Sequence, residues 1–205
     1  MNIKNVVFDF GQVIVHFNPK YMVERYVEDK ADIALLEEVV FDRLYWDKLD
    51  AGTITDEQTI NEIHKRIPER LWELSDKIYY NWIYNIPEIE GMRELIKYLK
   101  EKYNVKLFLL SNISKYFASH SGEIDILNEF EKCIFSSSIG IVKPSREIFE
   151  YLCKECNIKP EQTIFVDDNA KNIDGANAFG IKGYLFDGDI SSLKSFFDNI
   201  LKKSK

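Results

Sequence analysis

The chain has 205 residues, of which 45% are hydrophobic and 30% are charged, and its net charge is -7. This length and composition are typical of one large globular domain, or of a core with a smaller insert, and they exclude a disordered chain. The excess of 34 acidic over 27 basic residues argues against nucleic acid as a partner, because such a surface repels phosphate. No apolar run reaches membrane-spanning length and no signal-peptide pattern precedes the first expected strand, so we expect a cytoplasmic protein with no membrane partner.

An apolar run near the amino terminus ends on an acid. Residues 6–8 predict a buried parallel strand, so Asp9 lies at its carboxyl end. In an open α/β sheet that end faces the ligand crevice, where a carboxylate can attack a substrate or bind a metal. Gly11 is expected to let the backbone turn sharply and approach whatever Asp9 holds. The alternative is that Asp9 only ends the strand as a turn residue.

The next segment, residues 18–86, is predicted to contain helices and no strand. Helical patterns cover four stretches, Pro19 to Val27, Ile33 to Leu44, Asp56 to Ile67 and Glu69 to Tyr84. Thr55 precedes an acidic turn and predicts the start of the third helix. Most aromatic side chains of this segment are interpreted as packing, and residues 45–52 are a candidate for a substrate contact.

After Pro87 the pattern changes to strands that alternate with helices. Strands are expected at residues 105–110, 133–136, 163–166 and 183–186, and helices at residues 88–103, from 114, at 145–156 and at 173–179. Alternating βα units imply a mostly parallel sheet with right-handed crossovers. We therefore predict an α/β fold with a core formed by residues 1–17 and 87–205 and a helical insert at residues 18–86.

Polar side chains lie at the ends of several expected strands. They are Asp9, Ser111 and Asn112, Lys143, and Asp167 with Asp168. Carboxylates that meet in one crevice repel one another unless a cation binds among them, and magnesium prefers oxygen ligands. A hydroxyl, an amide and an ammonium group would then hold the oxygens of a phosphoryl group. The set predicts phosphoryl transfer with Asp9 as the attacking group, although each motif alone could be a helix cap, a turn or a loop.

These motifs resemble the haloacid dehalogenase superfamily of hydrolases. The resemblance rests on residues 8–11, 110–112, 142–144 and 166–169, together with Asn172. It implies a Rossmann-like core with an inserted helical cap, and a nucleophile, Asp9. It also implies magnesium held by Asp9, the Gly11 carbonyl and Asp168. Asp167 would then either replace Asp168 as a ligand or contact the ligands without touching the metal.

The similarity is closer still to a bacterial sugar-phosphate phosphatase subgroup that acts on glucose 1-phosphate. The shared stretches are the opening F-D-x-G-x-V-I-V and the run D-D-N-x-x-N-I-x-G-A-N. The resemblance thus implies a magnesium-dependent phosphatase that acts on a small phosphorylated metabolite, such as a hexose phosphate.

The sequence departs from the family pattern at one important position. Most phosphatases of the superfamily carry a second aspartate, the general acid and base, where this chain has Gly11. A positioned acid is typically worth roughly a hundredfold to ten-thousandfold in rate. Three substitutes are open: a good leaving group, a proton relay through water or a substrate hydroxyl, and His16, since histidine is a common proton donor in enzymes. His16 could equally be a packing residue at the entrance to the insert.

Two other functions compete with the phosphatase. In a dehalogenase-type hydrolase the same aspartate attacks carbon without a metal, which makes the adjacent Asp167 and Asp168 hard to explain. In a catalytically weak regulator or ligand-binding module, the missing acid leaves a slow phosphoaspartate or a crevice that only holds a ligand. The oligomeric state is not predicted.

Overall fold

The computed structural model describes residues 2–201, so the first residue and the last four residues of the predicted core lie outside the described part. Five parallel strands form one sheet in the order β3-β2-β1-β4-β5. They are β1 (Asn5–Phe8), β2 (Lys106–Ser111), β3 (Lys132–Phe135), β4 (Thr163–Asp167) and β5 (Lys182–Leu185). Phe8 pairs with Leu109 on one side and with Val166 on the other, so the ends of the three inner strands lie level. The predicted α/β class is confirmed.

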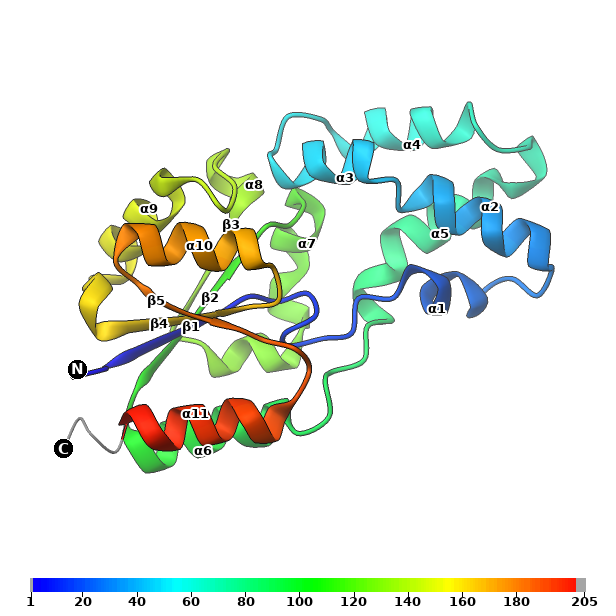
Figure 1. Cartoon of the computed structure of the whole chain (residues 1–205). Helices are drawn as coiled ribbons and strands as arrows, with labels where there is room; N and C mark the ends of the chain where they lie inside the picture. The colour runs from blue at the N-terminus through cyan, green and yellow to red at the C-terminus, as the bar shows by residue number, and fades with distance from the viewer. Residues whose placement is uncertain (1, 202–205) are drawn as a thin grey trace.

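Helices cover both faces of the sheet (Figure 1). Val6 and Phe8 of β1 join one apolar cluster together with α6 (Met92–Tyr103) and α11 (Ile190–Leu201). Val7 joins a second cluster on the opposite face. That cluster includes side chains of α9 (Arg146–Cys156) and α10 (Ala170–Phe179). This alternation is what the pleat of a strand buried on both faces requires.

The remaining helical elements lie on the core side and within residues 18–86. On the core side they are α7 (Lys115–His120), α8 (Ser136–Ile139), η3 (Ser121–Glu123), η4 (Asp125–Glu129) and η5 (Pro160–Gln162). Within residues 18–86 they are α1 (Pro19–Glu24), α2 (Lys30–Val40), α3 (Arg43–Asp50), α4 (Asp56–His64), η1 (Glu69–Leu71), α5 (Trp72–Asn81) and η2 (Trp82–Tyr84). All residues of this segment are described and none lies in a strand, as predicted.

Capping side chains explain where two of these helices begin. Thr55 forms a capping box with Gln58, which starts α4 at the predicted residue. The single helix expected over residues 33–44 is instead two helices. Asp42 accepts a hydrogen bond from the Leu44 backbone N–H at 2.9 Å and caps α3, so the chain turns between α2 and α3.

A column of aromatic rings joins the helical segment to the core. Phe10 follows β1, and the centroid of its ring lies 4.8 Å from the ring centroid of Phe117 in α7. Phe117 stacks on Trp82 at 5.5 Å, and Trp82 contacts Trp46 of α3 at 5.2 Å. Figure 1 shows α1–α5 grouped beside the sheet rather than over either face. The division into a core and a cap at the predicted boundaries stays a prediction.

Among the described residues, no helix has both the length and the apolar character needed to cross a membrane.

Candidate active site

A pocket of about 310 Å³ lies at the carboxyl ends of the inner strands. We call one side of it the strand-end wall, which consists of Asp9, Gly11, Ser111, Asn112, Lys143, Asp168 and Asn172. The other side, the helical wall, consists of Phe17, Arg43, Trp46, Asp50 and Trp82. Ligands of open α/β sheets bind at this edge. The structure therefore brings the predicted strand-end motifs together around one cavity.

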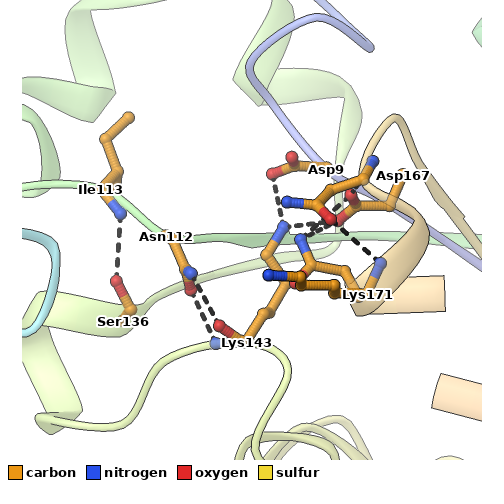
Figure 2. Close-up of polar contacts among 9 residues, drawn as sticks. Asp9, Asn112, Ile113, Ser136, Lys143, Asp167 and Lys171 are labelled. Atoms are coloured by element: carbon orange, nitrogen blue, oxygen red, sulfur yellow. Dashed lines mark hydrogen bonds and ion pairs between the residues drawn. The ribbon is translucent and has the colours of Figure 1, made fainter. Parts of the chain in front are cut away.

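Lys143 is the centre of a buried charge cluster (Figure 2). Its Nζ lies 2.7 Å from Asp9 Oδ1 and 2.7 Å from Asp167 Oδ2, and its side chain is 1% exposed. Burial by itself lowers the pKa of Lys143, but the two carboxylates outweigh it and raise that pKa, so the ammonium group stays charged. A buried charge persists only when it is paired, and here the pairing also fixes where the ammonium group points.

Asp167 is completely buried and holds this lysine in place. Its carboxylate accepts hydrogen bonds from the Asn172 side chain at 3.0 and 3.1 Å and from the Asn169 backbone N–H at 2.8 Å. All of its contacts face the protein, and Asp167 is not among the residues that line the pocket. Asp168, the next residue, is exposed and lines it. This geometry supports the preference for Asp168 as the metal ligand.

Three carboxylates lie close enough to share a cation. Asp9, Asp167 and Asp168 each offer an oxygen, and these oxygens lie within 4.8 Å of one another. Burial raises the pKa of Asp9 to about 6, with Asp167 adding to the effect and Lys143 opposing it. Burial and the Asp167 charge also raise the pKa of Asp168. The ionised cluster is thus short of positive charge, and an all-oxygen donor set fits a magnesium ion.

Ser111 and Asn112 have different surroundings. Ser111 ends β2, is 2% exposed, and lines the pocket beside Asp9. The Asn112 side chain donates to the Lys143 carbonyl at 3.1 Å and accepts from the Lys143 backbone N–H at 2.8 Å, as Figure 2 shows. Its amide is therefore engaged in holding Lys143, whereas it was predicted to bind substrate. The hydroxyl of Ser111 keeps the predicted position for a phosphate contact.

The structure bears on two expectations about the loop after β1. His16 is exposed and does not line the pocket, because its backbone N–H bonds to the Pro87 carbonyl at 2.8 Å and holds it at the entrance to the helical segment. This argues against His16 as the proton donor. Gly11 was expected to let the backbone turn sharply, but Gly11 does not have a positive φ and a Cβ built there would meet no atom within 4 Å, so the turn does not depend on a glycine at this position. The left-handed residue is Gln12, with φ 57°.

Two pocket residues come from the segment that was predicted only as a candidate for substrate contact. Trp46 and Asp50 lie four residues apart, on one face of α3, and both line the pocket. Asp50 is 7% exposed, and burial raises its pKa to about 7. Their spacing was a usable signal, but the sequence does not say which face of α3 turns toward the site.

The chain belongs to the haloacid dehalogenase-like hydrolase family, whose model matches residues 3–180. This confirms the resemblance on which the four motifs were interpreted. A D-ribitol-5-phosphate phosphatase from Bacteroides thetaiotaomicron is 26% identical over 190 residues, which cover 89% of this chain and 91% of that protein.

Two solved structures are similar over nearly their whole length. One is a predicted HAD-like hydrolase from Porphyromonas gingivalis, with a TM-score of 0.70 and 25% identity over 96% of this chain and 98% of that one. The other is a HAD family enzyme from Bacteroides thetaiotaomicron in complex with magnesium and inorganic phosphate. Its TM-score is also 0.70, with 23% identity over 93% of this chain and 98% of that one. These likenesses confirm the fold and leave the substrate open.

Proposed function

We propose that this protein is a magnesium-dependent phosphatase that hydrolyses a small phosphorylated metabolite through an aspartyl-phosphate on Asp9. The buried charge cluster carries the proposal. Three carboxylates and the single ammonium group of Lys143 sum to a charge of -2 when all are ionised. A divalent cation neutralises that charge, and it would be held by Asp9, the Gly11 carbonyl and Asp168. The similarity to a phosphatase over nine-tenths of the chain supports the same reaction class.

The residues of the strand-end wall divide the reaction between them. Asp9 attacks the phosphorus atom, the bond to the leaving oxygen breaks, and water then hydrolyses the acyl phosphate to release inorganic phosphate. Bound magnesium would neutralise the charge of the phosphoryl oxygens. Ser111 and Lys143 hold those oxygens, since an ammonium group has three protons and Lys143 uses only two on Asp9 and Asp167.

The pocket supports a small polar substrate. Its volume of about 310 Å³ is at the lower end of ligand sites, and its lining mixes aromatic rings with charged groups. Among phosphorylated metabolites we propose a sugar or sugar-alcohol phosphate. Glucose 1-phosphate follows from the motif similarity, and D-ribitol 5-phosphate is the substrate in the name of a relative. We retain the prediction that the enzyme acts in the cytoplasm.

Phosphate release from a panel of sugar and polyol phosphates tests this proposal. We expect release to require magnesium, to stop with a chelator, and to be absent in Asp9→Asn. The exposed Glu94 of α6 gives a control, since Glu94→Gln neutralises a carboxylate outside the pocket. Release that persists in Asp9→Asn or without any divalent ion would overturn the proposal. Binding of phosphate without turnover of any substrate would favour the ligand-binding module.

A further inference from the structure

We propose that Asp50, on the helical wall, is the acid that protonates the leaving-group oxygen. This inference rests on the phosphatase function proposed above. The reaction leaves an alkoxide when the substrate is a sugar or polyol phosphate, and such a poor leaving group needs a proton as its bond to phosphorus breaks. Gly11 has no side chain that could give it, and His16 lies outside the pocket.

The direction of attack selects the helical wall as the source of this proton. In phosphoryl transfer the attacking and leaving oxygens lie roughly in line through the phosphorus atom. Asp9 attacks from the strand ends, so the leaving oxygen faces the opposite side of the pocket. Among the described residues on that side, Asp50 alone carries a carboxyl group, and its neighbours are aromatic rings and Arg43.

Asp50 differs from the other buried acids because its carboxyl group has no fixed partner. Within residues 2–201, no hydrogen bond or ion pair to its side-chain oxygens is found, although the residue is only 7% exposed. Asp167, by contrast, is satisfied on every side by Lys143, Asn172 and Asn169. A carboxyl group without a partner is costly to bury in its charged form. Because no protein group bonds to its oxygens, the Asp50 carboxyl group can bond to a ligand in the pocket.

The backbone of Asp50 is anchored, through Ser136, to the loop that follows β2. Ser136 Oγ donates to the Asp50 carbonyl at 2.6 Å and accepts from the Ile113 N–H at 3.0 Å, and Ile113 follows Ser111 by two residues. Figure 2 shows the bond between Ser136 and Ile113. The chain then turns at Gly52, where φ is +68° and a Cβ would lie 2.7 Å from the Ser137 carbonyl oxygen. These contacts fix the end of α3 against the core.

Burial favours the protonated form of Asp50, while the charged groups around it act in both directions. Arg43 and Asp47 belong to its own helix, and Asp9 and Lys143 face it across the pocket. Burial has the largest effect and raises the pKa of Asp50 to about 7; the two carboxylates add to it and the two cations oppose it. An acid of this strength is half protonated near neutrality, the range in which general acid catalysis is most efficient.

Asp9 and Asp50 both return to their starting states at the end of the proposed reaction. An oxygen of Asp9 forms a bond to phosphorus, and the electron pair of the breaking bond stays on the leaving oxygen. That oxygen takes the proton of Asp50 and departs as an alcohol. Water then attacks the aspartyl-phosphate, the bond between Asp9 and phosphorus breaks, and the hydrogens of that water leave on the inorganic phosphate. The Asp50 carboxylate regains its proton from solvent, which restores both residues.

A comparison of leaving groups tests this role. 4-Nitrophenyl phosphate has a stable leaving anion that needs no proton, whereas a sugar or polyol phosphate does need one. We expect Asp50→Asn to lower kcat on the alkyl substrate by about 10²–10⁴-fold and to change kcat on 4-nitrophenyl phosphate little. Glu94→Gln, which neutralises an exposed carboxylate of α6 outside the pocket, should change neither. Asp50→Glu keeps the acid and should retain more alkyl activity than Asp50→Asn.

Adding an acid elsewhere provides a second, independent test. A Cβ at position 11 would meet no atom within 4 Å, so Gly11→Asp is sterically permitted. This change should restore alkyl phosphate turnover in the Asp50→Asn variant. Equal losses on both substrates, without this rescue, would assign Asp50 to binding or structure and overturn the inference. An unchanged rate of Asp50→Asn on the alkyl substrate would also overturn it, but would leave the Asp9-dependent phosphatase intact. Lack of turnover in the unmodified protein would instead remove the proposed function itself.

Discussion

The two walls of the pocket are built in different ways. On the strand-end wall, Asp9 follows a strand that is hydrogen-bonded on both sides, and Lys143 is tied to two carboxylates. The helical wall presents rings and one unpartnered acid, Asp50, and its α3 is fastened to the core through Ser136 and the close approach at Gly52. The difference separates two tasks. The strand-end wall suits the phosphoryl group, which all substrates of a phosphatase share. The helical wall suits the rest of the substrate, which differs from one substrate to another.

The largest effect on stability and activity is expected when the strand-end wall loses the ammonium group of Lys143. Lys143→Met leaves Asp9 and Asp167 buried without their shared partner, so we expect about 3–5 kcal/mol lower stability and no phosphatase activity. Denaturant unfolding measures the first and phosphate release the second. Adding Asp167→Asn to this variant should recover part of the stability and none of the activity. A stability loss that the second change does not reduce would contradict the charge-pairing account.

A smaller effect, in the pH dependence of turnover, should trace to the helical wall. Because the pKa of Asp50 is raised to about 7, its proton is present below neutrality and is lost as the pH rises. We expect kcat on an alkyl phosphate to fall about tenfold per pH unit above that pKa. The same enzyme should show no such fall on 4-nitrophenyl phosphate. An alkaline limb that survives in Asp50→Asn would show that another group controls it.

The contact between the end of α3 and the core can be disturbed by adding a methyl group at Gly52. Gly52→Ala places a Cβ against the Ser137 carbonyl and strains a positive φ, so we expect about 1–3 kcal/mol lower stability. Turnover of alkyl phosphates should fall more than that of 4-nitrophenyl phosphate, since Asp50 is displaced. Gly188 also has a positive φ but nothing within 4 Å of a Cβ, which makes Gly188→Ala the control for strain alone. If the ratio of alkyl phosphate to 4-nitrophenyl phosphate turnover were the same in both variants, the position of α3 would not control proton transfer from Asp50.

The smallest effect is expected far from both walls, between α6 and α11. Asp198 accepts hydrogen bonds from Tyr103 and Tyr98 at 2.6 Å each, which with Lys194 hold its pKa well below its usual range. A depressed carboxyl pKa stabilises the fold above the unfolded pKa, and this stability is lost as the pH falls toward the folded pKa. Asp198→Asn should therefore lower stability at pH 7 and make unfolding less acid-dependent below about pH 4. Its phosphatase rate should match that of the unmodified enzyme.

Sequence patterns predicted the strand-end wall better than the helical wall. Asp9, Ser111 and Asp168 were assigned to the site because each follows an apolar run, and the carboxyl ends of parallel strands meet at one edge. The helix α11 was not among the predicted elements, and one expected helix proved to be two, since Asp42 caps the second. Helix starts and helix faces leave weaker patterns in a sequence than an unbroken apolar strand does, and these two helical regions were therefore predicted less well than the strands.

The sequence by itself determined the α/β order, the identity of the strand-end acids and the absence of an acid at Gly11, because all three follow from residues close together in the chain. Only the tertiary structure placed Asp50, the acid that we propose in its place, at the pocket. The bond between Ser136 and Asp50 joins residues 86 positions apart, and no local pattern encodes which face of α3 such a contact turns inward. For the same reason His16 appeared suitable from its spacing alone, yet the packing of the helical segment leaves it in solvent.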